Sequence, residues 1–183
     1  MSQVKELLIE ELQDLLHAET QLVNAIPKMA QAAKAEKLRE AFEKHLAQTQ
    51  VHAKRLQQVL EMLGGDSEPT PCRAMMGLIE EGQERIDEAD SKEEIPADLS
   101  IITAAQKIEH YEIAGYGTAA TLAREIGELD VVRLLERTLG EEESTDHMLT
   151  MISKPLLQQA RMEDLTSGQS SRKTSRSPKT RHA

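Results

Sequence analysis

Apolar residues recur every three or four positions along four long stretches of the chain, a spacing typical of amphipathic α-helices. A shorter stretch of the same kind, residues 71–90, separates the second long stretch from the third. The four long stretches are residues 4–33, 37–63, 97–126 and 130–153.

Glycine and proline indicate where these helices should end. Gly64 and Gly65 are expected to end the second helix and Gly127 the third, because glycine readily adopts the left-handed conformation that follows a helix. Pro155 is expected to lie just beyond the end of the fourth helix. Pro27 lies inside the first helix and predicts a kink or a local break there.

The lengths of the connections predict how the helices are arranged. Short links join the first helix to the second and the third to the fourth, so each pair forms an antiparallel hairpin, and a long link joins the two hairpins. We therefore expect an all-α protein, an antiparallel four-helix bundle with a short extra helix in the long crossover. The bundle is expected to occupy residues 1–165, and a basic, disordered tail residues 166–183.

Charge separates this tail from the bundle. The net charge of the chain is −10, yet the final residues carry five bases and no acid, so the bundle itself is strongly acidic. An acidic surface repels nucleic acid, and only the tail offers it a weak, salt-sensitive attachment without sequence recognition. A tail that binds nothing is the simpler interpretation. The five bases are Arg172, Lys173, Arg176, Lys179 and Arg181.

Other features of the sequence narrow the class of protein. The lone Cys72 cannot form an internal disulfide and suits a reducing compartment. No apolar run approaches the roughly 20 residues that span a bilayer, and the acidic N-terminal segment is unlike a signal peptide. We therefore expect a cytoplasmic protein without membrane association. No Ser/His/Asp triad, phosphate-binding glycine loop or paired cysteine motif supports a hydrolase or a nucleotide-dependent enzyme.

Polar residues interrupt the apolar stripe near the midpoint of every long helix. In an antiparallel bundle the midpoints lie at one level, so these side chains are expected to converge in the interior. Isolated carboxylates there would cost on the order of several kcal/mol each, and few lysines or arginines lie on the stripes to compensate them. The interrupting residues are Glu19 in the first helix, His45, Gln48, Thr49 and His52 in the second, Glu109 and Glu112 in the third, and Glu142 and Asp146 in the fourth.

A divalent metal would compensate such a cluster of acids. Carboxylate and imidazole ligands suit iron or manganese, and zinc is a further option. His45 and Tyr116 are expected to be packed in the core or to support the ligands from a second layer. A single glutamate on an apolar stripe is more commonly a residue at the edge of the stripe, whose carboxylate reaches water, than a metal ligand.

Four segments of the chain resemble the YciE/YciF-like family of bacterial ferritin-like proteins, and together they extend over most of residues 6–152. The resemblance implies a rubrerythrin-like four-helix bundle, usually dimeric, that acts in bacterial stress responses. It implies no defined activity, so whether the protein is an enzyme stays open. The segments are "ELLIEELQDLLHAETQLVNAIPKMAQAA", "HLAQTQVHAKRLQQVLEMLGG", "AAQKIEHYEIAGYGTAATLA" and "LLERTLGEEESTDHML".

The resemblance also implies ligands in the first two helices. Glu19 matches the single glutamate that the first helix contributes to ferritin-like diiron sites. His52 matches the histidine of the second-helix Glu-x-x-His motif, but Thr49 stands in place of the glutamate of that motif. Gln48, where many relatives have a nearby glutamate, is an amide in this chain.

In the last two helices the resemblance implies further acids. Glu109 or Glu112 matches the glutamate of the third helix. Glu143 and Asp146 have the Glu-x-x-His spacing of the fourth helix with aspartate in place of histidine, although the register favours Glu142 as the inward acid. The standard set of four glutamates and two histidines is therefore incomplete, and either one or two metal ions remain possible.

Two functions follow as hypotheses. A homodimeric protein that binds one or two iron or manganese ions could oxidise ferrous iron or remove peroxide during oxidative or osmotic stress. The alternative is a non-catalytic structural or interaction protein that keeps the ferritin-like fold with a degenerate metal site. The predicted dimer rests partly on the apolar residues Met75, Met76 and Ile79 of the crossover helix.

Overall fold

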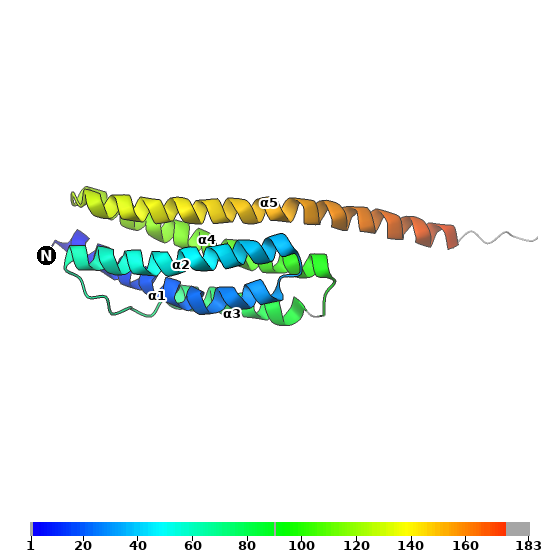
Figure 1. Cartoon of the computed structure of the whole chain (residues 1–183), viewed down its shortest axis with the longest axis horizontal. Helices are drawn as coiled ribbons and strands as arrows, with labels where there is room; N and C mark the ends of the chain where they lie inside the picture. The colour runs from blue at the N-terminus through cyan, green and yellow to red at the C-terminus, as the bar shows by residue number, and fades with distance from the viewer. Residues whose placement is uncertain (1, 90, 175–183) are drawn as a thin grey trace, which may run out of the picture.

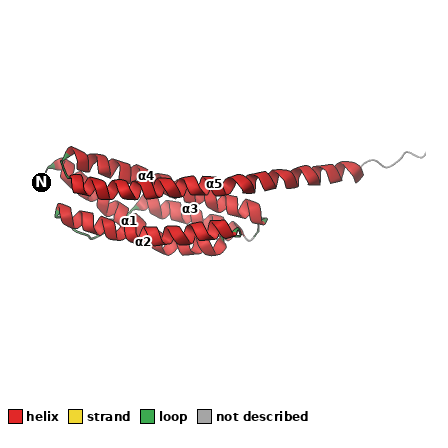
Figure 2. Cartoon of the chain, turned by 45° about the horizontal axis from the view of Figure 1, so that its top comes forward, coloured by secondary structure: helices red, strands yellow, loops and turns green. Residues whose placement is uncertain are grey.

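The computed structural model describes residues 2–89 and 91–174, with side chains as far as residue 165, and these described residues form five α-helices and no strand (Figure 1, Figure 2). The prediction of an all-α protein is therefore confirmed. No helix in this part of the chain is both long enough and apolar enough to cross a bilayer. The helices are α1 Gln3–Ala32, α2 Glu36–Leu63, α3 Arg73–Ala89, α4 Glu94–Glu125 and α5 Leu129–Thr174.

The four long helices close a bundle in the predicted order (Figure 1). Helix α1 packs against α2, α2 against α5, α5 against α4, and α4 against α1. The hairpins α1–α2 and α4–α5 are the two most extensive pairings, and α3 lies in the crossover between them. Because α3 contacts α1 and α4, it covers the side of the bundle that these two helices share.

Two local features bring the helices together as the sequence requires. Gly64 ends α2 with a φ of 67°, the left-handed conformation expected for a glycine at this position. Gly115 lies where α4 approaches α1 most closely, since a Cβ atom at this position would be 2.7 Å from a methyl carbon of Leu15. An alanine at residue 115 would force the side chain of Leu15 to shift beside the polar layer described below.

Helix α5 differs from its prediction because it continues past Pro155 to Thr174 and projects beyond the other helices (Figure 1, Figure 2). A proline removes one backbone hydrogen bond, but Met151, whose carbonyl is affected, is exposed to water. Ile152 and Leu156 pack on the core and hold the helix on both sides of the proline. Helix α1 likewise passes through the exposed Pro27 without a break.

The side chains of residues 166–174 and all of residues 175–183 lie outside the described part of the chain. The predicted tail, with the boundary at residue 166, therefore stays a prediction. The five tail bases fall in the same segment: Arg172, Lys173, Arg176, Lys179 and Arg181.

The core divides into two apolar clusters along the bundle. The first apolar cluster includes Leu12, Leu60 and Ala120, and the second includes Leu22 and Ile108. On each long helix the two sets are separated by the positions at which polar residues interrupt the stripe. A polar layer therefore crosses the middle of the bundle between two apolar regions.

The crossover helix contributes to the core and leaves little apolar surface. Met75 is fully buried in the second apolar cluster and Ile79 is partly buried against it, whereas Met76 is 51% exposed. Only one of the three residues proposed for a dimer contact is therefore freely available, and the dimer stays a prediction.

Candidate metal centre

Six ionisable side chains meet in the polar layer, each no more than 4% exposed. Helical geometry explains why they share one interior face, because residues three, four and seven positions apart point to the same side of a helix. The expected convergence at one depth is found. The six residues are Glu19 on α1, His45 and His52 on α2, Glu109 and Glu112 on α4, and Glu142 on α5.

These side chains form two groups that share one carboxylate. In what we call site 1, potential ligand atoms of Glu19, His52 and Glu142 all lie within 4.8 Å of one another. Site 2 meets the same criterion and consists of His45, Glu109, Glu112 and Glu142. Glu142 therefore stands where it could bridge two cations, one in each site.

In site 1, neighbouring side chains hold Glu19 and His52 in place. The hydroxyl of Tyr116 donates a hydrogen bond of 2.5 Å to Glu19 Oε1. His52 Nδ1 lies 3.4 Å from the same oxygen and 2.7 Å from Glu142 Oε1. The latter approach is off the line of a hydrogen bond, because both of these atoms lack a hydrogen-bond partner despite the short distance. The Nδ1 atom thus faces two carboxylates.

The opposite edge of the His52 ring is fixed by an ion pair. His52 Nε2 lies 2.9 Å from Glu141 Oε2, and Arg55 donates a hydrogen bond of 2.8 Å to that oxygen. Arg55 also donates to the hydroxyl of Thr138, which anchors the guanidinium group. A hydrogen bond from Nε2–H to Glu141 leaves Nδ1 as the ring atom available to a metal, the arrangement usual for ligating histidines.

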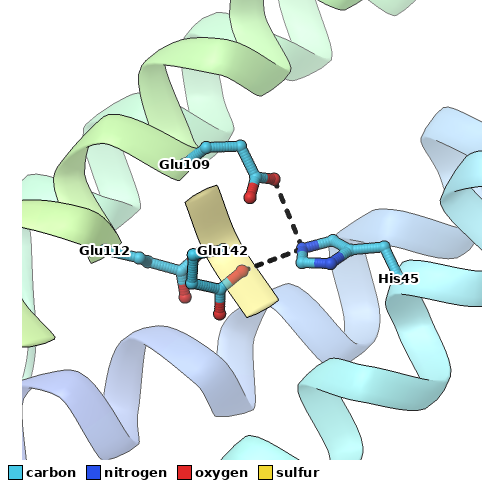
Figure 3. A group of neighbouring side chains, drawn as sticks. All are labelled: His45, Glu109, Glu112 and Glu142. Atoms are coloured by element: carbon cyan, nitrogen blue, oxygen red, sulfur yellow. Dashed lines mark ion pairs between the residues drawn. The ribbon is translucent and has the colours of Figure 1, made fainter. Parts of the chain in front are cut away.

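In site 2, His45 faces the carboxylates from the opposite side (Figure 3). Its Nε2 atom lies 3.3 Å from Glu109 Oε1 and 3.8 Å from Glu142 Oε2. Its Nδ1 atom lies 3.3 Å from the hydroxyl of Thr145, which itself donates to the carbonyl of Glu141. The Thr145 oxygen therefore accepts from His45 Nδ1–H, and the lone pair of Nε2 points into the site.

Every buried side-chain nitrogen or oxygen without a hydrogen-bond partner, among the described residues, belongs to this layer. Buried polar atoms normally find partners, so their concentration at one point indicates a missing group. Asp98 is equally buried but fully paired, since its two oxygens accept from the backbone N–H groups of Lys34 and Ala35. The eight unpaired atoms are Glu19 Oε2, His45 Nε2, His52 Nδ1, Glu109 Oε2, both oxygens of Glu112 and both oxygens of Glu142.

Burial and mutual repulsion change the acidity of the site 1 side chains. Burial raises the pKa of Glu19 to about 7, although His52 and Tyr116 oppose that shift. For His52 burial acts to lower the pKa, but the carboxylates of Glu142 and Glu19 outweigh it and raise the pKa to about 10. Without a metal, site 1 therefore carries its positive charge on the imidazolium of His52.

Site 2 has no comparable internal cation. Burial, followed by the charge of Glu142, raises the pKa of Glu109 well above its usual range. Burial and the charges of Glu19 and Glu142 do the same to the pKa of Glu112. Burial lowers the pKa of His45, so that imidazole is neutral. Glu109 and Glu112 therefore hold their protons more readily than ordinary glutamates, which reduces the negative charge of site 2 when no metal is bound.

The chemistry of these donors fits a pair of divalent ions. Each site combines one imidazole nitrogen with carboxylate oxygens, a set that suits iron or manganese and also accepts zinc. A cation in each site would replace the protons on the acids and satisfy the unpaired atoms. When no metal is bound, a proton on Glu109 lets the bare His45 Nε2 lie beside that carboxyl, and a cation would take the place of this proton.

The structure does not bring three of the sequence candidates into either group. Glu143 is exposed, because it lies one position, or about 100° of helix rotation, from the inward Glu142. Asp146 is partly buried and contacts Gln106 and His110 at the edge of the bundle. Gln48 is also only partly buried, whereas its neighbour Thr49 is fully buried.

The inward pair of α5 is therefore Glu142 and Thr145, with the Glu-x-x-His spacing but threonine in place of histidine. In α2, Thr49 stands at the glutamate position of the same motif, and its hydroxyl donates a hydrogen bond to the carbonyl of His45. Both threonines thus fill positions where a standard site has ligands. His45 and Glu109 take over on the adjacent helical turns and complete site 2.

Sequence reasoning missed the supporting layer around His52. Glu141 is only partly exposed and contacts both His52 and Arg55. A signal was available for Arg55, since an arginine three residues after a buried histidine lies on the same face of α2. His45 was expected to support the ligands, and it lies among them.

Comparisons with known proteins agree with the fold described above. A family described as "Domain of unknown function (DUF892)" matches residues 3–162. The chain is 44% identical over 151 residues to protein YciF of Escherichia coli strain K12, which covers 82% of this chain and 90% of YciF. The crystal structure of YciF, called a stress protein, matches with a TM-score of 0.82 at 40% identity over 86% of this chain and 99% of that chain. YcfI from Rhodopseudomonas palustris matches with a TM-score of 0.76 at 36% identity over 82% of this chain and 94% of that chain.

Proposed function

The chain belongs to the DUF892 family, and from its polar layer we propose that it binds two divalent metal ions, iron or manganese with zinc as a further option, in adjacent sites bridged by Glu142. The observation that carries the proposal is the set of eight buried atoms without a hydrogen-bond partner, all of which belong to side chains of the two sites. A cation at each site gives those atoms partners and removes the cost of burying acids.

The side chains of the layer have distinct roles in this proposal. Glu19 and His52 hold the ion of site 1, while His45, Glu109 and Glu112 hold that of site 2. Tyr116 keeps Glu19 oriented through its hydrogen bond, and the two apolar clusters exclude bulk water from both sites. Iron or manganese, when bound, supplies one-electron redox chemistry of the kind that oxidises ferrous iron or reduces peroxide.

We further propose that this chemistry serves the bacterial response to oxidative or osmotic stress. The support is similarity to YciF, which is called a stress protein. A cytoplasmic location fits the free, buried thiol of Cys72. A homodimer, and a weak attachment of the basic tail to nucleic acid, complete the proposal without support from the described residues.

A non-catalytic, structural role is the second candidate. It is favoured by Thr49 and Thr145, which occupy positions where a standard ferritin-like site has a glutamate and a histidine. In that case Glu109 and Glu112 would stay protonated permanently. The ferritin-like fold would then be kept for its packing or for interactions with other proteins.

Metal analysis separates the two candidates. The protein would be purified from cells grown with added iron and manganese, and the metal content per chain measured by mass spectrometry. Crystals of the same protein would yield anomalous-difference maps at each absorption edge. We expect two peaks, one in each site, and a melting temperature that falls when the metal is removed with a chelator.

The opposite result is equally clear. Less than about a tenth of an equivalent of metal, with a melting temperature unchanged by added iron, manganese or zinc, would remove the metal-binding proposal. A single peak at site 1 or site 2 would reduce it to a mononuclear site.

A further inference from the structure

We propose that Tyr111 and Cys72 form a redox relay that carries an oxidising equivalent away from the polar layer, with Asp14 as the acceptor of the phenolic proton. The relay goes beyond metal binding, because it assigns one-electron chemistry to two side chains of the protein itself. Its role beside the metal ions rests on the proposed function, whereas its chemistry can be tested in the metal-free protein.

Three side chains, from α1, from α4 and from the residue just before α3, form a chain of hydrogen bonds. The hydroxyl of Tyr111 donates to Asp14 Oδ2 at 2.5 Å, and Cys72 Sγ lies 3.0 Å from the same hydroxyl. Because the single proton of the phenol is engaged with Asp14, the thiol of Cys72 donates to the phenolic oxygen. The order of donors is therefore Cys72, Tyr111 and Asp14.

Further contacts hold Cys72 in place and keep the relay protonated. The sulfur accepts a hydrogen bond of 3.3 Å from the backbone N–H of Met75, and the backbone N–H of Cys72 donates to His17 Nδ1 at 3.0 Å. Burial raises the pKa of the Cys72 thiol. Burial, followed by the hydrogen bond to Asp14, raises the pKa of Tyr111. Both groups therefore carry a hydrogen that they can release on oxidation.

The relay begins next to site 2 and ends at the protein surface. Tyr111 precedes Glu112 in α4. Burial and the other acids of the polar layer raise the pKa of Glu112, and Cys72 adds to this shift, so the sulfur lies within electrostatic reach of that carboxyl. Neither oxygen of Glu112 has a hydrogen-bond partner, and the residue belongs to site 2. Asp14, at the other end, is partly exposed to water.

Each step of the relay moves one electron and one proton. Tyr111 gives one electron to an oxidised metal ion in site 2, of the kind that peroxide produces, and its phenolic proton passes to the carboxylate of Asp14. The S–H bond of Cys72 then breaks, and its hydrogen atom re-forms the O–H bond of Tyr111. Phenolic O–H and thiol S–H bonds have similar strengths, so the hydrogen atom can pass from one to the other. The oxidising equivalent ends as a thiyl radical on Cys72, outside the set of metal ligands.

Tyr116 is the natural control for Tyr111. Its hydroxyl donates to Glu19, a ligand candidate of site 1, and its side chain is fully buried, so it has no comparable path to water. The chain has two tyrosines and no tryptophan. A radical on an aromatic side chain other than histidine or the lone phenylalanine can therefore be assigned by comparing Tyr111→Phe with Tyr116→Phe.

Flash photolysis of the metal-free protein tests the relay. A photogenerated ruthenium(III) tris-bipyridine complex removes one electron from tyrosine, and electron paramagnetic resonance and optical absorption follow the tyrosyl radical. We expect this radical in the unaltered protein and in Tyr116→Phe, and its absence from Tyr111→Phe. In Cys72→Ser the radical should persist several-fold longer, because the serine oxygen can replace the bond to Met75 but its O–H bond is too strong to give up the hydrogen atom.

A matched pair of variants tests the proton acceptor. Asp14→Asn should slow formation of the radical several-fold, because an amide does not take the phenolic proton. Glu10→Gln, the same loss of charge at an exposed position of α1, should leave the rate unchanged and controls for attraction of the cationic complex.

Three outcomes would each overturn the proposal: no radical on Tyr111, a radical whose lifetime is the same in Cys72→Ser, or equal rates of formation in Asp14→Asn and Glu10→Gln. Because no metal is present in these experiments, failure to bind iron or manganese would remove the proposed function and leave their result standing.

Discussion

Site 1 and site 2 lie side by side and share Glu142, but they accommodate buried acids in different ways. In site 1 Glu19 accepts a hydrogen bond from Tyr116, and His52 is held by Glu141, so the ligand candidates are positioned before any metal arrives. In site 2 neither oxygen of Glu112 has a partner. Site 1 is therefore preorganised by hydrogen bonds, whereas site 2 depends on protons or a cation to compensate its acids.

Removing the shared carboxylate should have the largest effect. In Glu142→Gln both sites lose an anionic ligand and the bridge between them, so we expect the metal content to fall from two ions per chain to almost none. Mass spectrometry of the purified protein measures this. Glu143→Gln is the matched control, because it makes the same change on the exposed neighbour. Equal loss in both variants would show that site geometry is irrelevant to binding.

Replacing one histidine should remove the ion from one site and leave the ion of the other site bound. We expect His45→Asn to lose the ion of site 2 and to keep that of site 1, and His52→Asn to do the reverse. Anomalous-difference maps of the two variants distinguish the outcomes, and each variant serves as the control for the other. If both variants lose both ions, the sites act as one unit and the comparison between them fails.

The metal-free protein should become less stable as pH rises. Between pH 4.5, the ordinary pKa of a glutamate, and about 7, folded Glu19 keeps a proton that the unfolded chain has lost. Between pH 6.5 and about 10 the same holds for His52. The free energy of unfolding therefore decreases as the pH rises through both ranges. Glu19 alone accounts for a decrease on the order of 3 kcal/mol.

Urea unfolding in the presence of a chelator measures this dependence. Glu19→Gln should remove the part that belongs to Glu19 and also reduce the part that belongs to His52, because the Glu19 carboxylate helps to raise the pKa of His52. A free energy of unfolding that rises through both ranges would contradict the assigned protonation states. Bound metal should oppose the trend, because ligands bind cations only after they lose their protons.

Replacing the unpaired acid of site 2 should stabilise the metal-free protein. Glu112→Gln removes a buried carboxyl that has no hydrogen-bond partner, and we expect a gain of about 1–3 kcal/mol at neutral pH. Glu19→Gln should give a smaller gain, because it removes a buried acid but also weakens the contacts of Glu19 with Tyr116 and His52. Chemical unfolding of the two metal-free variants compares the halves directly, and an equal gain in both would mean that site 2 is as well paired as site 1.

The smallest effect is expected from the hydroxyl of Tyr116. Tyr116→Phe keeps the ring in the first apolar cluster and removes only the hydrogen bond to Glu19. We expect roughly tenfold weaker metal binding at site 1 and unchanged binding at site 2, since supporting residues of this kind typically contribute that much. Titration calorimetry resolves the two affinities. Equal weakening at both sites would show that Tyr116 acts through overall stability.

Much of the fold could be predicted because apolar residues recur with the helical period along the whole bundle. The apolar stripe identified all four long helices, and the short and long connections gave their pairing. The predicted end of α5 was wrong. Proline usually ends a helix, but here Ile152 and Leu156 pack on the core on either side of Pro155 and hold the helix together. The proline is tolerated at Met151, four positions earlier, because that residue is exposed, and exposure is a tertiary property.

The sequence predicted the level along the bundle at which the candidate ligands lie, but not which of two adjacent residues points inward. Glu19, His52, Glu109 and Glu112 stood at matching positions along their helices, and they meet in the polar layer. Adjacent positions are harder to separate, because one residue turns a helix by only about 100°. Glu142 and Glu143 could not be distinguished for that reason, although one is fully buried and the other exposed.

Helical periodicity is a local property of the chain, so the positions of the helices and the depth of their acids could be read from the residues alone. The contacts of His45 with Glu109, of His52 with Glu141 and Arg55, and of Glu142 with both sites depend on the packing of the helices. These contacts join different helices, so they depend on how each helix is rotated against its neighbours.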